Sequence, residues 1–166
     1  NPEPLHEVNE RGLLWWEDLV LQGYPLAFTC GMDLHGKWDM KNQYATFIEG
    51  KPDGNIEEEL EKAIKNQKTW ISRGPILEAS VNKVNKTITF SIHMTNKPGY
   101  LHKDSDPYYL SIKTKSGTYT EQISEQTPLT IAYEQFEKDK ILLPKLYQCN
   151  TEIENLVTVA PTIILP

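Results

Sequence analysis

The segment from Asp53 to Met94 constrains the fold most, because its pattern is that of one amphipathic helix followed by a β-hairpin. Asn55 is a favourable N-cap, and Glu58 stands three positions later, which is capping-box spacing. Gly74-Pro75 is a typical helix end. The pattern therefore predicts a helix over about residues 55–73 with one apolar face. That face comprises Ile56, Leu60, Ala63, Ile64 and then Trp70 or Ile71.

The segment after the predicted helix has the pattern of an antiparallel hairpin. Residues Ile76 to Val81 and Thr87 to Met94 flank a polar turn. In the second of these strands every other residue is apolar, which is typical of a strand with one buried and one wet face. The residues expected on the buried face are Ile88, Phe90, Ile92 and Met94, so we expect the segment to organise a core.

The rest of the chain is rich in short strands. Alternating or β-branched segments predict strands near residues 108–112, 119–123 and 129–133, and residues 133–140 are expected to hold one helical turn. The expected fold class is α+β, with one main helix, an antiparallel hairpin and a β-rich C-terminal half. Before the helix, residues 13–50 allow more than one fold.

Within that N-terminal region, two segments carry a local signal. Apolar residues from Gly12 to Leu21 are too dense for a one-sided surface helix, so a short buried helix and a strand both fit. Residues Tyr44 to Ile48 have the β-branched and aromatic content of a strand.

The length of 166 residues suits one domain with an arm at either end. Residues 1–12, with two prolines near the start, are expected to form an extended N-terminal arm. Residues 13–155 would form a single α+β domain. Residues 156–166 are apolar and lack lysine and arginine, so they are expected to form an edge strand or an arm that docks on a neighbour.

The charge of −6 and the pI of about 5.2 disfavour nucleic-acid binding, which requires a concentration of Lys and Arg. The same balance disfavours an anionic membrane surface. No apolar run is long enough to span a bilayer, and no signal-peptide pattern is present. Since the chain does not begin with Met, a secreted origin stays open.

Two cysteines, Cys30 and Cys149, are too far apart in sequence for a local redox or zinc pair. They are either two small buried hydrophobic residues or one disulfide that closes a long loop. Asn85, followed by Lys86 and Thr87, is a candidate glycosylation acceptor.

Motifs that carry chemistry are weak in this chain. Asp33, His35 and Asp39 form the nearest approach to a metal cluster, but they match no known ligand spacing. A calcium loop beginning at Asp104 lacks the required Gly and Glu. No nucleophile elbow and no phosphate-binding Gly-rich loop occurs. We therefore assign no catalytic, cofactor-binding or metal-binding residue, and expect no cofactor.

Apolar residues near the two ends are candidate partner contacts. Trp15 and Trp16 form either a platform for a partner or part of a core, and the core interpretation is favoured. In the C-terminal tail, the candidates are Ile163, Ile164 and Leu165.

The helix–hairpin segment resembles the small baseplate wedge proteins of contractile-tailed phages, in which an acidic-capped helix leads into two antiparallel strands. The matching segments are residues 57–64, 70–71, 76–81 and 87–92, within the span 55–94, which is about a quarter of the chain. The stretch from Gly12 to Asp18 is similar, in its Trp15-Trp16-Glu17-Asp18, to a Gly-Trp-Trp-Gly-Asp element of Mu-like tail proteins, although Glu17 replaces the second Gly. The segment from Tyr100 onward has no counterpart. The resemblance implies a structural role in a virion.

Three functions follow from these observations. The first is a structural assembly protein with protein partners, a phage tail baseplate component in the virion or in cytoplasmic assembly. The second is a secreted or surface β-sandwich-like binding module with a Cys30–Cys149 disulfide. An enzyme ranks third, because no motif places a catalytic group.

Overall fold

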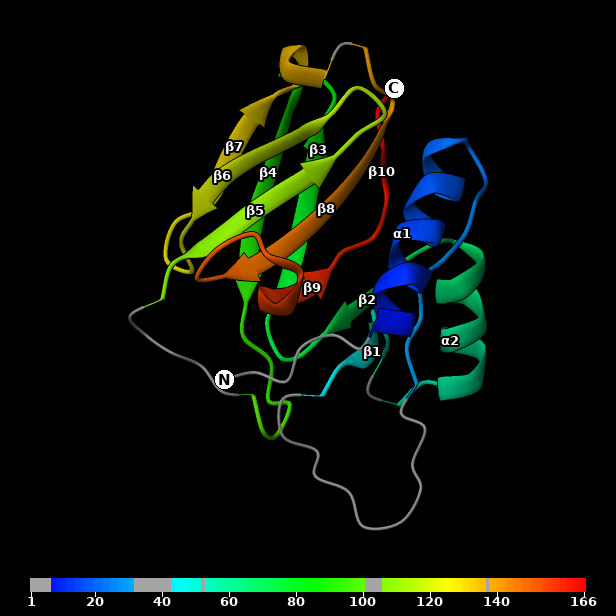
Figure 1. Ribbon diagram of the computed structural model, residues 1–166. Coiled ribbons are helices and arrows are strands. Elements are labelled where there is room, and N and C mark those ends of the chain that lie inside the picture. The colour runs from blue at the N-terminus through cyan, green and yellow to red at the C-terminus, as the bar shows by residue number, and fades with distance from the viewer. Residues whose placement is uncertain (1–6, 32–42, 52, 101–105, 137) are drawn as a thin grey trace.

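The computed structural model describes residues 7–31, 43–51, 53–100, 106–136 and 138–166. These residues form a mixed α+β fold with two α-helices and antiparallel sheets. Figure 1 shows the sheets at one side of the molecule and both helices at the other. The helices are α1 (Glu7–Leu21) and α2 (Ile56–Lys65). Two 3-10 helices, η1 (Tyr133–Phe136) and η2 (Ile153–Asn155), complete the helical elements of this part of the chain.

The larger sheet has seven strands in the order β1-β2-β9-β8-β5-β6, with β10 also paired to β8. The smaller sheet has the order β3-β4-β7. All pairings in both sheets are antiparallel. The strands are β1 (Ala45–Ile48), β2 (Thr69–Ser72), β3 (Ile76–Asn82), β4 (Thr87–His93), β5 (Tyr108–Lys113), β6 (Thr118–Ile123), β7 (Leu129–Ala132), β8 (Ile141–Gln148), β9 (Leu156–Val159) and β10 (Ile163–Ile164).

The two sheets pack face to face and enclose the main core. Alternate residues of β4 point into it, so the predicted inward face of the hairpin is confirmed for three of its four members. The exception is Met94, which lies beyond the end of β4 and is 45% exposed. The core residues include Leu77, Ile88, Phe90 and Ile92 from the smaller sheet and Leu110, Ile112, Leu142 and Leu146 from the larger one.

A second core lies on the other face of the larger sheet, where α1 packs. Leu13, Trp16 and Val20 recur at helical spacing and contact apolar residues of β2, β8 and β9. The dense apolar segment from Gly12 to Leu21 is thus a buried helix, as one of the two predicted alternatives had it. Because α1 begins at Glu7, however, residues 7–12 are helical, and the predicted extended arm over 1–12 is wrong for them.

Strand β8 lies between the two cores, in a segment for which no strand was predicted. Leu142 and Leu146 face the sandwich, while Leu143 and Tyr147 face α1, so both faces are buried. Pro144 interrupts the usual strand signal. Its carbonyl accepts a hydrogen bond from Ala160 N at 3.0 Å, on the side where β9 gives way to β10. Since the N and C=O of one strand residue point to the same side, the missing N–H of Pro144 faces this break and not β5.

The C-terminal tail forms strands of the larger sheet, which excludes the docking arm, one of the two alternatives predicted for residues 156–166. Strand β9 is inserted between β2 and β8, and all four of its residues are buried. Strand β10 then pairs with the other end of β8. The apolar composition of the tail reflects burial within its own domain.

The helix α2 is shorter than the predicted span of 55–73. Its predicted N-cap is confirmed, because Asn55 Oδ1 accepts a hydrogen bond from Glu57 N at 3.1 Å. The helix ends at Lys65, and Gln67 adopts a left-handed φ of 55° that reverses the chain. Trp70 and Ile71, expected on the helical face, belong to β2 and pair across to β1.

Candidate protein-interaction surface

Helix α2 crosses from β1 to β2 at the edge of the larger sheet. Its start is held by Asn55, whose side-chain amide also donates to Glu58 Oε1 at 3.1 Å. Acidic residues fill the first turn and lysines the last, which suits the helix dipole. These local interactions stabilise the helix without any contribution from its apolar face.

The apolar face of α2 lies largely outside both cores. Ile56 is 76% exposed, Leu60 39% and Ile64 41%, whereas Ala63 is buried at 7%. We call Ile56, Leu60 and Ile64 the apolar strip. Of this face only Ala63, the smallest side chain, reaches the protein interior, so the part of the segment that organises the core is the hairpin, as expected.

Carboxylates border the apolar strip on both sides. With about 100° between successive residues, Glu57 and Glu61 follow one border and Glu59 lies on the other. Glu61 forms an i,i+4 ion pair with Lys65 on the exposed surface of the helix. Glu57 and Glu59 have no ion pair with any residue that the structure describes.

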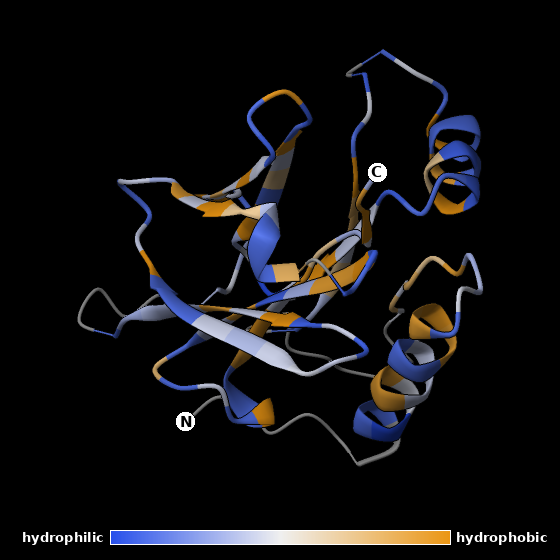
Figure 2. Ribbon diagram, turned by 90° about the horizontal axis from the view of Figure 1, so that it is seen from above, coloured by the Kyte–Doolittle hydropathy of each residue, from blue (hydrophilic) through white to orange (hydrophobic). Residues whose placement is uncertain are grey.

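Further exposed apolar side chains lie at the same end of the molecule. Figure 2, which views the fold from above, shows α1 and α2 on one side of the two sheets. Among the residues that the structure describes, seven of the ten exposed large hydrophobic ones come from α1, the segment after it and α2, so apolar exposure is concentrated at this end. Besides the apolar strip, they are Leu14, Trp15, Tyr24 and Leu26.

The two tryptophans predicted as candidate contacts have different roles. Trp15 is 69% exposed and stays a candidate for partner contact. Trp16 is 6% exposed, stacks on Phe28 with ring centroids 4.9 Å apart, and donates from Nε1 to Leu26 O at 3.1 Å. Trp16 is therefore a core residue, and its prediction as a partner contact is corrected.

The three C-terminal candidates alternate between buried and exposed, as successive residues of a strand do. Ile163 and Leu165 are each 7% exposed and belong to the main core, so they are not available to a partner. Ile164 is 65% exposed and points outward. Only Ile164 among the tail residues keeps its predicted role as a candidate contact.

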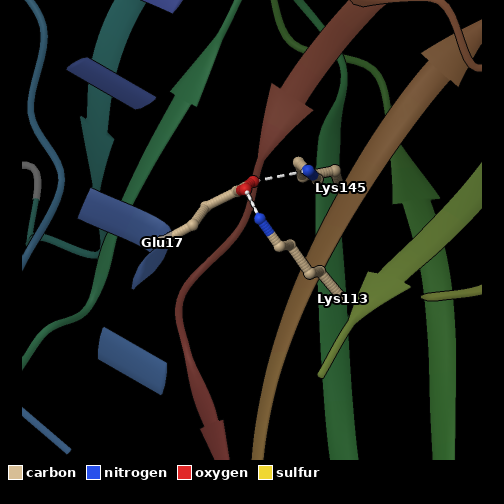
Figure 3. A network of polar contacts seen from close by, with 3 residues as sticks. All are labelled: Glu17, Lys113 and Lys145. Atoms are coloured by element: carbon tan, nitrogen blue, oxygen red, sulfur yellow. Dashed lines mark hydrogen bonds and ion pairs between the residues drawn. The ribbon is translucent and has the colours of Figure 1, made fainter. Parts of the chain in front are cut away.

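A buried ion network joins α1 to the larger sheet. Glu17 is fully buried, and its two carboxylate oxygens accept hydrogen bonds from Lys113 Nζ at 2.6 Å and Lys145 Nζ at 2.5 Å. Figure 3 shows Glu17 reaching from α1 to the two lysines of the neighbouring strands β5 and β8. The network is placed to hold α1 in position on the sheet. None of its three residues was predicted as a site, because Glu17 is distant in sequence from both lysines.

The two cysteines are both free thiols, so the candidate Cys30–Cys149 disulfide is not formed in this structure. Cys149 is exposed. Cys30 is half-buried, and Thr46 Oγ1 lies 3.6 Å from its Sγ. Burial raises the pKa of the Cys30 thiol, against a smaller opposite effect of the Thr46 hydrogen bond. A protonated thiol at neutral pH is a poor nucleophile.

Other candidate sites are placed only in part. Asn85 is exposed in the turn between β3 and β4, where a modifying enzyme can reach it. The carboxylate–imidazole group Asp33, His35 and Asp39 lies outside the described residues, as does Asp104. Within the described ranges, no group of three or more His, Cys, Asp and Glu residues could hold a metal ion. Neither described helix is long and apolar enough to cross a membrane.

A hollow of about 320 Å³ lies between the β3–β4 turn, η1 and the C-terminal residues. Its lining residues include the buried Phe136 and Leu165 and the lysines Lys83, Lys86 and Lys140. Glu134 and Asp139 also line it, so cations and carboxylates are mixed. The arrangement lacks the single-sign charge or catalytic grouping that would specify a ligand.

Comparison with known proteins identifies no relative: no protein-family model, no curated protein and no solved structure matches the chain.

Proposed function

We propose that the protein is a binding module whose helical end holds a protein partner in an assembly. The observation that carries this proposal is the exposed apolar strip of α2. Each side chain of the strip keeps apolar surface in contact with water in the isolated chain. Full burial of a large aliphatic side chain contributes about 1.5–3 kcal/mol, and covering the part that is still exposed would contribute a fraction of this. Exposed apolar surface bordered by charge is typical of interaction sites.

The resemblance to baseplate wedge proteins supports an assembly role, and the phage-tail identity remains a prediction. The expected docking arms do not contribute to the proposal, because residues 7–12 are helical and residues 156–166 are largely buried in the sheet. The proposed contact surface instead comprises the apolar strip of α2 and Trp15 of α1.

A site-specific photo-cross-link in the source organism tests this proposal. With the cross-linker at Leu60 we expect one defined protein adduct. At Val84, an equally apolar position that is 91% exposed at the tip of the β3–β4 turn, we expect none. Adducts of the same pattern at both positions, or none at Leu60, would contradict a docking role for the apolar strip.

A second candidate is a secreted or surface β-sandwich-like binding module. The face-to-face packing of the two sheets and the exposed Asn85 support it. Mass measurement of the native protein before and after deglycosylation and reduction tests it. A glycan at Asn85 would favour this candidate, and an unmodified chain with two free thiols would count against it.

A further inference from the structure

We propose that the apolar strip of α2 receives one amphipathic helix whose own apolar face is bordered by Lys or Arg. The proposal rests on the proposed function and names the chemistry of the partner at that surface. Three features of the strip carry it: its ridge geometry, its length and the charge of its borders.

The geometry of the strip favours a helix as the partner. Ile56, Leu60 and Ile64 stand at i, i+4 and i+8, and therefore form a single i±4 ridge along α2. Such a ridge fits the groove between corresponding ridges of another helix, which is the commonest mode of helix–helix packing. Ala63, beside the ridge, is buried against the rest of the protein. The partner would therefore lie on the side of α2 that faces away from the protein.

The length of the strip limits the contact. Ile64 stands eight positions after Ile56, which corresponds to about 12 Å along the helix axis. Two to three turns of a partner helix cover this distance. The apolar face of the partner is therefore expected to present residues at the same i, i+4 and i+8 spacing.

The charge at the borders selects a basic partner. Glu57 and Glu59 flank the first half of the ridge on opposite sides and have no ion pair within the described residues. Lys62 and Lys65 lie on the far side of the helix from the ridge, by the same 100° spacing. Lys or Arg beside the partner's apolar face would meet these carboxylates, while a partner with acidic borders would be repelled.

Two synthetic peptides of about 15 residues test the charge and the apolar contact separately. Both carry Leu at i, i+4 and i+8; one has Lys at the flanking positions and the other has Glu. Binding of each fluorescently labelled peptide to the full chain is measured by anisotropy at about 20 and about 200 mM salt. We expect the Lys peptide to bind more tightly and to weaken at the higher salt concentration.

Four variants of the chain assign the binding to the strip. Leu60→Gln should lower the affinity of the Lys peptide by about tenfold or more, because it removes the centre of the ridge. The pair Glu57→Gln and Glu59→Gln should lower it about threefold or more and reduce the salt dependence. The conservative pair Glu57→Asp and Glu59→Asp should retain it. The control pair Glu134→Gln and Glu154→Gln makes the same change in net charge at exposed positions away from α2 and should leave the affinity unchanged. Circular dichroism verifies that α2 persists in each variant.

Equal affinity for the two peptides, or equal loss in the Gln pair and the control pair, would overturn the proposal of a basic partner. If neither peptide binds but the cross-linker at Leu60 still yields its adduct, the basic-helix inference is overturned and the proposed function stands. If the cross-link also fails, both are overturned.

Discussion

Replacing Glu17 by Gln tests how strongly the buried ion network holds α1 on the sheet. Glutamine nearly preserves the shape of the side chain, but it removes the negative charge that lies between Lys113 and Lys145. Two ammonium groups then remain beside a neutral amide. Removing one member of a buried ion pair typically destabilises a protein by about 3–5 kcal/mol, because the remaining charge is buried without compensation.

The exposure of the two lysines places Glu17→Gln near the lower end of that range. The Lys113 side chain is 27% exposed, so its ammonium group can turn toward water. The Lys145 side chain is only 10% exposed and has no such route. We therefore expect a loss of about 3 kcal/mol in the free energy of unfolding. For a chain of this size, that corresponds to a fall in Tm of roughly 6–12 °C.

Urea unfolding followed by tryptophan fluorescence provides the assay, with calorimetry for the Tm. A double-mutant cycle with Lys145→Met isolates the interaction, because methionine fills a similar volume without charge. We expect the variant carrying both changes to be more stable than Glu17→Gln alone. A loss below about 1 kcal/mol for Glu17→Gln, or additive losses in the cycle, would refute the assigned role of the carboxylate.

Three further predictions concern single positions. Gly74→Ala should destabilise the protein by about 1–3 kcal/mol in urea unfolding, because an added Cβ would lie 2.6 Å from Cγ of Tyr100; unchanged stability would contradict this close approach. Burial raises the pKa of Tyr44 to about 12. Since the unfolded chain ionises from about pH 10, stability should fall between pH 10 and 12, by roughly 2 kcal/mol from this group at pH 12, and Tyr44→Phe should flatten that slope. Iodoacetamide at neutral pH should alkylate the exposed Cys149 well before the half-buried Cys30, whose pKa is raised; equal rates by mass spectrometry would contradict that difference.

The local elements that the sequence predicted are those whose signals lie within a few residues. The start of α2 depends on Asn55 and the first turn, and the β3–β4 hairpin depends on period-two alternation around a polar turn. Both signals persist whatever the rest of the chain does. The end of α2 was mispredicted because Gly74-Pro75 is a strong stop signal, whereas the chain had already reversed at Gln67.

The sequence could predict which residue types would suit a partner contact, but not whether each side chain is exposed. Trp15 and Trp16 are adjacent and chemically identical, yet one is exposed and the other is core, because they stand about 100° apart on α1. The same holds for Ile164 between its buried neighbours in β10. The sequence identifies the apolar residues that could contact a partner, and only the packing of each helix or strand decides which of them face solvent.

The sequence by itself determined the local structure: a capped amphipathic helix beginning after Asn55, an alternating hairpin and an α+β class with a β-rich C-terminal half. The tertiary structure alone decided what each face meets. It buried β8 between two cores despite Pro144, inserted the apolar tail as β9, and brought Glu17 to Lys113 and Lys145 across about a hundred residues of sequence. It also left the apolar strip of α2 in water. The physical reason is that periodicity specifies an amphipathic face, while the covering of that face depends on contacts between residues distant in the chain.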